Sequence, residues 1–177
     1  MEEQWYTITG DIDTNIAQNL IVWVNNALYS SNIKRLKIII SSGGGDIDSA
    51  IRIYSYLKAL PIEIEMIAFS QIDSAANVIF SAGSKRIAIN GCRFLLHEGI
   101  FTSGHKTATL HNHDEALITF KELLKKSISI ISQETGKTEA EIGNLMQNST
   151  FLTTEEAKAL GLVTEILEKM PLAKQTI

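Results

Sequence analysis

Ser74 is the residue whose type and position most suggest chemistry. It lies within residues 69–83, where an apolar, strand-like stretch is followed by a polar turn and then by a helix of small and apolar residues. A hydroxyl at such a junction lies beside backbone N–H groups that the first turn of a helix leaves unpaired. Nucleophilic serines use strand-to-helix elbows of this kind, because the same turn helps to hold an oxyanion. The simpler alternative is that Ser74 is only the N-cap of the helix.

Two other features follow predicted strands and could act with a serine. Gly43, Gly44 and Gly45 can direct backbone N–H groups at an oxygen of a ligand, or can form no more than a flexible turn. They do not match a phosphate-binding loop, because no Gly-Lys-Ser/Thr ending follows them. His97, near the end of a later apolar strand, is a candidate general base for Ser74, and its alternative is a structural histidine.

The remaining candidates for metal or redox chemistry are weak. His111, His113 and Asp114 are close in sequence, but residues two apart on a helix point to different sides, so we expect no metal site there. Cys92 is the single cysteine, lacks the spacing of a metal site and is interpreted as a buried thiol. The sequence thus predicts no metal and no cofactor.

Length, charge and composition limit the classes of function. The chain has 177 residues, 45% of them hydrophobic, and a net charge of −4, so we expect a single domain over residues 1–177 with a sizeable core. No basic patch is interleaved with aromatic residues, which argues against a nucleic-acid partner. No apolar run is long enough to span a membrane, and the N-terminus has no signal core. Together with the lone cysteine, these features predict a cytoplasmic protein.

The predicted elements that position these residues alternate along the chain. Strands are expected at residues 5–9, 35–41, 62–69, 86–89, 93–99 and 162–167, and helices over about 14 residues from Asp13 or Thr14, at 47–57 and within 69–83. Three consecutive isoleucines in the second strand indicate burial on both faces, as in a parallel sheet covered by helices. The β-α-β order predicts such a sheet, with the chemistry at the carboxyl ends of the strands, where the glycines and Ser74 both fall.

A long helix is predicted over about residues 108–133, after a loop or irregular strand at 100–106. Its broad apolar face is typical of packing against another subunit as well as against its own domain. Capping boxes at 138–141 and 153–156 predict two further helices. The tail at residues 168–177 has no clear pattern.

From residue 5 to about 167 the chain resembles the ClpP family, the proteolytic subunit of the Clp protease and a family of serine peptidases. Four segments carry the resemblance in the family's order: ISSGGGDI at 40–47, SQIDSA at 70–75, RFLLH at 93–97 and FLTTEEAKALGLV at 151–163. They are similar to the family's glycine-rich loop, to the segment around its nucleophile, to the segment that ends in its catalytic histidine, and to its C-terminal Glu-Glu-Ala segment. The resemblance implies an α/β, crotonase-like fold with a mainly parallel sheet, in which the long helix is a protruding handle.

The resemblance also implies a reaction, that of a serine-type endopeptidase. Ser74 would be the nucleophile, and His97 would take its proton and pass it to the leaving amine. The backbone N–H groups of Gly45 and Ala75 form the implied oxyanion hole.

Three kinds of partner follow from the resemblance. An extended peptide or an unfolded protein is the implied substrate, and it would lie along Gly43 and Gly44, where a side chain would obstruct it. Further copies of the chain would assemble with it as a heptameric ring or a double ring. A Clp-type ATPase is expected less than these two, because the chain begins almost at the first predicted strand, where the family has a longer N-terminal segment.

The chain departs from the family at the third catalytic position. The family's aspartate lies two residues before the phenylalanine of the fourth segment, and this chain has Ser149 there, preceded by Asn148. Either residue could orient His97 by a hydrogen bond, but neither stabilises an imidazolium as an aspartate does. Asp73 or Asp114 could substitute in space.

Two other departures touch the implied site. Gly43 stands where the family has a proline, and Ala76 and Asn77 stand where it has a Gly-Ala pair. Two alternative functions therefore stay open. One is a catalytically impaired subunit that acts in assembly or regulation, and the other is a crotonase-type acyl-CoA enzyme, which rests on fold analogy alone.

Overall fold

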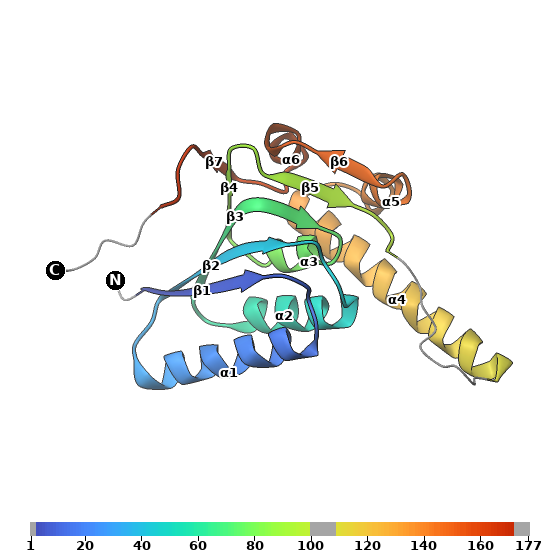
Figure 1. Cartoon of the computed structure of the whole chain (residues 1–177), viewed down its shortest axis with the longest axis horizontal. Helices are drawn as coiled ribbons and strands as arrows, with labels where there is room; N and C mark the ends of the chain where they lie inside the picture. The colour runs from blue at the N-terminus through green and yellow to red at the C-terminus, as the bar shows by residue number, and fades with distance from the viewer. Residues whose placement is uncertain (1–2, 100–108, 172–177) are drawn as a thin grey trace.

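The computed structural model describes residues 3–99 and 109–171, in which strands and helices alternate along most of the chain (Figure 1). The strands are β1 (Glu3–Thr9), β2 (Arg35–Ser42), β3 (Glu63–Asp73), β4 (Lys85–Ile89), β5 (Arg93–Leu96), β6 (Thr150–Leu152) and β7 (Glu165–Leu167). The helices are α1 (Thr14–Ser30), α2 (Ile47–Ala59), α3 (Ala76–Phe80), α4 (Leu110–Thr135), α5 (Glu139–Gln147) and α6 (Thr154–Leu160). The loop predicted at 100–106 lies outside the described residues, as does most of the tail predicted at 168–177.

Within the described residues, seven strands form one sheet that is parallel except at β6. β1, β2, β3, β4 and β7 are neighbours in that order. β5 pairs in parallel with the end of β3 and antiparallel with β6. The prediction of a mainly parallel sheet is confirmed. β3 has two partners on the same side: its middle pairs with β4, and its last three residues pair with β5.

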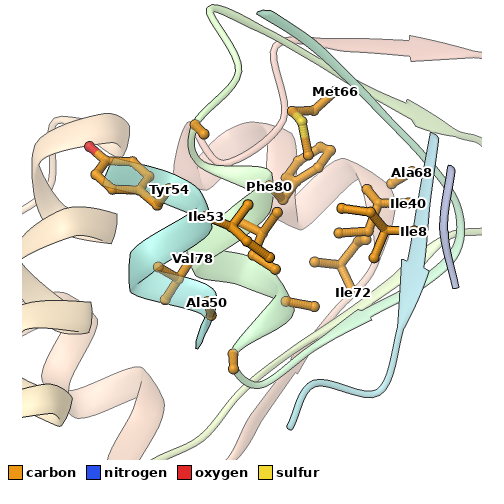
Figure 2. Close-up of a cluster of buried hydrophobic side chains, with 14 of the residues drawn as sticks. Ile8, Ile40, Ala50, Ile53, Tyr54, Met66, Ala68, Ile72, Val78 and Phe80 are labelled. Carbon is orange, nitrogen blue, oxygen red and sulfur yellow. The ribbon is translucent and has the colours of Figure 1, made fainter. Parts of the chain in front are cut away.

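The core lies between the strands and the helices, and Figure 2 shows the part of it that α2 and α3 cover. It includes Ile8, Ile40, Met66, Ala68 and Ile72 from the strands, and Ala50, Ile53, Val78 and Phe80 from the helices. The expectation that β2 is buried on both faces is wrong. Ile38 and Ile40 are buried, but Ile39 between them is only half-buried. The reason is that α1, α2 and α3 cover one face of these strands (Figure 1).

Local signals located most helix ends. The side chain of Asp13 accepts a hydrogen bond from the first turn of α1, and both predicted capping boxes are present, at α5 and α6. Gly136 ends α4 in the left-handed conformation. The segment 69–83 differs from its prediction in two ways. Its polar part continues β3 to Asp73, because these residues pair with β5, and α3 has only 5 residues. The short strand β6 was not predicted.

The last turn of α4 is anchored to the core, while the other end of the helix projects from it (Figure 1). Arg86 of β4 donates a hydrogen bond to the carbonyl of Glu134 in that turn at 3.0 Å. The carboxylate of Glu134 accepts from the hydroxyl of Tyr54 at 2.6 Å and pairs with Lys58 at 2.8 Å, both on α2. Burial, and then this hydrogen bond, raise the pKa of Tyr54, so that it remains a donor. Ile118, toward the projecting end, is 61% exposed.

Candidate active site

The Ser74 elbow has a strained backbone conformation that strand β5 holds in place. Ser74 lies between the end of β3 and the start of α3. Its φ of 56° is in the left-handed region, where a residue other than glycine costs about 1–3 kcal/mol. Its N–H donates to the carbonyl of Leu95 on β5 at 2.8 Å, and its carbonyl accepts from the backbone N–H of Asn77 at 3.0 Å. Contacts between distant parts of the chain therefore stabilise a conformation that the local sequence disfavours.

Ser74 is not a helix cap. The N-cap of α3 is Ala75, and no side-chain hydrogen bond caps this helix. In residues 3–99 and 109–171, the hydroxyl of Ser74 has no hydrogen-bond partner. The N-cap interpretation is therefore wrong, and the hydroxyl is available to the cavity that Ser74 lines.

Two of the three loop glycines are required by close packing. A side chain on Gly44 would place its Cβ 2.6 Å from the Cβ of Ser74, and one on Gly45 would collide with the backbone of Ile12. The N–H of Ile12 donates to the carbonyl of Gly44 at 2.7 Å, so the loop is held in place and is not a flexible turn. Gly43 is less restricted, because the atom nearest to its added Cβ would be 3.6 Å away.

A cavity of about 820 Å³ opens beside the elbow, and Ser74, Ala75, Gly43 and Gly45 form part of its wall. The backbone N–H groups of Gly45 and Ala75 donate to no other group in the described part of the chain. Gly45 immediately precedes the N-cap of α2, and Ala75 is the N-cap of α3. Unpaired N–H groups at such positions carry partial positive charge. Two such groups beside a serine hydroxyl can stabilise the oxyanion of an acyl-transfer reaction.

His97 follows β5 directly and lines the same cavity. The pairing of β3 with β5 places Asp73 opposite Leu95, the residue whose carbonyl accepts from the N–H of Ser74. His97 follows Leu95 by two residues. Nδ1 of His97 accepts a hydrogen bond from the backbone N–H of Gly99 at 3.0 Å. Because a backbone N–H can only donate, the neutral imidazole carries its proton on Nε2. Among the described residues, no hydrogen bond joins His97 to Ser74.

Asn148 and Ser149, the predicted partners of His97, lie at the end of α5. The side-chain amide of Asn148 donates to the carbonyl of Asn144 at 2.9 Å. Ser149 is exposed, and its N–H donates to the carbonyl of Met146 at 3.1 Å. Across the described residues, neither of the two predicted partners hydrogen-bonds to His97 or lines the cavity. That either one orients the histidine stays a prediction.

The acidic residues of the site are not those considered as substitutes. Asp73 is buried and accepts from Arg93 at 2.8 Å, and Asp114 is exposed on α4. Glu98 and Glu115 do line the cavity, and sequence analysis missed both. The signal for Glu115 was its helical spacing with further α4 residues of the wall, among them those at positions 112, 116, 119 and 123.

Other chemistry finds little support in the described ranges. Cys92 is buried as predicted, and burial, with the nearby charge of Asp73, raises the pKa of its thiol to about 12, so that the thiol is unreactive at neutral pH. Between residues 3 and 171, with 100–108 left aside, no three His, Cys, Asp or Glu side chains are grouped to hold a metal ion. In the same residues, no helix has the length and apolar character needed to cross a membrane.

Comparison with known proteins relates the chain to one protein family. The family model of the Clp protease matches residues 1–170. Proteolytic subunit 1 of the ATP-dependent Clp protease of Thermobifida fusca is 26% identical over 171 residues, which cover 94% of this chain and 75% of that protein. Proteolytic subunit 2 of the ATP-dependent Clp protease of Frankia casuarinae is 27% identical over 135 residues, which cover 75% of this chain and 61% of that protein.

A solved structure extends the likeness to the fold. A mutant of ClpP1 from Listeria monocytogenes superposes with a TM-score of 0.82 at 20% identity, covering 93% of this chain and 91% of the other. An α/β sheet that brings a serine elbow and a histidine to one cavity is an arrangement that serine hydrolases use. Because the family model matches nearly its whole length, the chain belongs to the Clp protease family, and the predicted ClpP-like fold is confirmed.

Proposed function

We propose that this protein is a serine endopeptidase that cleaves peptides or unfolded protein segments. The observation that carries the proposal is the left-handed Ser74 elbow, with the unpaired N–H groups of Gly45 and Ala75 beside it and His97 in the same cavity. Membership of the Clp protease family supports it, since the relatives are named as proteolytic subunits.

In the proposed reaction, Oγ of Ser74 attacks the carbonyl carbon of a peptide bond while Nε2 of His97 takes the hydroxyl proton. The N–H groups of Gly45 and Ala75 stabilise the oxyanion, and removal of one such donor typically costs about 10²–10³ in kcat. His97 then gives the proton to the leaving amine. Water hydrolyses the acyl-enzyme by the same steps.

This chemistry needs the other tautomer of His97. Nε2 can take a proton only when Nδ1 carries the hydrogen of the ring, but Nδ1 accepts from Gly99. The N–H of Gly99 must therefore move away, and a group that accepts a hydrogen bond must take its place. Asn148 and Ser149 are the groups proposed from sequence for this role.

A catalytically impaired subunit is the second candidate function, and the contact between Gly99 and His97 favours it. If that contact persists, His97 is a poor base and the chain would act in assembly with, or regulation of, active copies. No feature of the described residues favours an acyl-CoA enzyme.

The proposal includes a ring-shaped homo-oligomer. The projecting part of α4 exposes Leu117 and Ile118, an apolar surface suited to contact between copies. Because the relatives are named as subunits of ATP-dependent proteases, a Clp-type ATPase is the proposed class of partner. An extended substrate would lie along Gly43 and Gly44. The buried Cys92 suits a reducing compartment, so a cytoplasmic location is also proposed.

A fluorophosphonate probe tests the proposed function, because it forms an adduct with an activated serine. We expect an adduct on Ser74, located by mass spectrometry, and loss of both the adduct and the turnover of an unfolded substrate in Ser74→Ala. Ser84→Ala is the matched control, because its hydroxyl donates to the carbonyl of Ile64 and does not line the cavity. Unchanged turnover in Ser74→Ala would contradict the proposal. No adduct and no turnover with the chain alone, together with tight association with an active relative, would favour the impaired subunit.

A further inference from the structure

We propose that Asn77 is a positioning residue that fixes the Ser74 elbow against strand β5 and so sets the separation between Ser74 and His97. Its effect on rate rests on the proposed function, whereas its effect on the elbow follows from the contacts alone. Asn77 lies in the first turn of α3 and is completely buried. The only sequence signal at this position was a departure from the small Gly-Ala pair of the family.

The side-chain amide of Asn77 joins the two segments that carry the serine and the histidine. Nδ2 donates to the carbonyl of Ser74 at 3.1 Å and to the carbonyl of Leu95 at 2.9 Å. Leu95 precedes His97 by two residues. The orientation of the amide is fixed, because turning it over would place its oxygen against both carbonyls.

Stability does not explain this polar side chain. The carbonyl of Leu95 already accepts from the N–H of Ser74 at 2.8 Å, and the carbonyl of Ser74 already accepts from the backbone N–H of Asn77 at 3.0 Å. Oδ1 of Asn77 is buried without a hydrogen-bond partner in the described residues, which is unfavourable. An apolar side chain of similar size would therefore serve the core at least as well. What the amide adds is a defined geometry.

The position of His97 relative to Ser74 needs this support because the pairing between β3 and β5, the strand that precedes the histidine, is short. β5 has 4 residues and pairs with β3 only from Arg93 to Leu95. The Asn77 amide adds a bond where this ladder ends, just before the chain leaves the sheet toward His97. Proton transfer from Ser74 depends on placement, and an error of about 1 Å can cost about 10²-fold in rate.

Asn77→Leu tests the role of the amide, because it keeps the size and removes every polar group. We expect kcat for an unfolded substrate to fall about 10- to 100-fold with KM nearly unchanged, and the thermal midpoint of unfolding to stay equal or rise. Hydrogen exchange at the Ser74 amide, measured by mass spectrometry or NMR, should become faster, because its bond to Leu95 opens more often. If Asn77→Leu does not fold, Asn77→Ala, which adds no bulk, is expected to give the same changes in kcat and in exchange at Ser74, with a lower thermal midpoint because of the cavity it leaves.

Thr154→Val is the matched control. The hydroxyl of Thr154 is also buried and also donates to a carbonyl beside β5, that of Cys92 at 2.8 Å, but Thr154 does not line the cavity. We expect this variant to lose stability while kcat and exchange at Ser74 match the wild type.

Two outcomes separate this proposal from the proposed function. Unchanged exchange at Ser74 and unchanged kcat in Asn77→Leu would overturn the role of Asn77, even if Ser74 is confirmed as the nucleophile. If the wild type has no Ser74-dependent turnover, the peptidase proposal fails, and faster exchange at Ser74 in the variant would still support the positioning of the elbow by Asn77.

Discussion

Ser74 and Ser149 have nearly the same left-handed backbone conformation, with φ angles of 56° and 50°, but the fold holds them in different ways. The N–H of Ser74 donates to Leu95 on another strand, and its carbonyl accepts from both the backbone and the side chain of Asn77. The N–H of Ser149 donates to Met146 in the last turn of its own helix, and Ser149 is exposed. Among the described residues other than glycine, these two alone have a positive φ.

The left-handed conformation has a different origin at each serine: at Ser149 it ends a helix, and at Ser74 it is strain beside a candidate site. Helices commonly end in a left-handed residue, so the conformation of Ser149 needs no functional explanation. A left-handed serine between a strand and a helix, held by bonds from distant elements, is the kind of strain that persists at functional sites. The position proposed for the nucleophile is therefore held by distant elements, whereas the position that resembles the family's aspartate is held only locally.

The largest effect is expected at Ser74. Ser74→Gly removes the hydroxyl and relieves the left-handed strain, so peptide turnover should fall about 10⁴-fold or more. The free energy of unfolding should rise by about 1 kcal/mol or less, because glycine adopts this conformation freely. Turnover assays and chemical denaturation measure the two effects. Turnover that survives in this variant would mean that another residue is the nucleophile.

A smaller effect is expected when Ser149 receives a carboxylate. Aspartate tolerates a positive φ, and a carboxylate that accepts from Nδ1 would hold His97 in the tautomer in which Nε2 takes the proton. We expect kcat of Ser149→Asp to rise about tenfold, a small part of the roughly 10⁴-fold effect of such an aspartate in a serine protease. Nitrogen-15 NMR of labelled histidine should show the ring proton on Nε2 in the wild type and on Nδ1 in the variant.

Ser149→Asn is the matched control for this change, because its amide has the shape of aspartate without the charge. Equal rates in the two variants, with the His97 proton still on Nε2, would mean that the end of α5 does not reach the histidine. Glu98 and Glu115, which line the cavity, would then be the carboxylates to test.

Features with local signals could be predicted from the sequence. The capping boxes of α5 and α6 and the glycine that ends α4 depend only on neighbouring residues. The structure has all three at the predicted helix ends. The β-α-β order also placed the glycine loop and Ser74 at one edge of the sheet, because the carboxyl ends of parallel strands meet there. Both line the same cavity with His97.

Features that depend on distant segments could not be predicted. The continuation of β3 to Asp73 requires β5 as a partner, and the φ of Ser74 requires the bond to Leu95. The contact of Gly99 with His97 and the burial of the Asn77 amide have no periodicity or motif that would reveal them. In the proposed function, these contacts set the tautomer of His97 and the position of Ser74.

The smallest effect concerns stability at helix ends. Ser149→Gly should raise the free energy of unfolding by about 0.5–1 kcal/mol, because glycine is the preferred left-handed residue after a helix.

Gly136→Ala is the reciprocal control at the end of α4, where φ is 71° and an added Cβ meets nothing within 4 Å. It should lose about 1 kcal/mol from backbone strain alone. Chemical denaturation measures both. If Ser149→Gly is no more stable than the wild type while Gly136→Ala loses stability, Ser149 is held by more than its own helix, and its contrast with Ser74 would not stand.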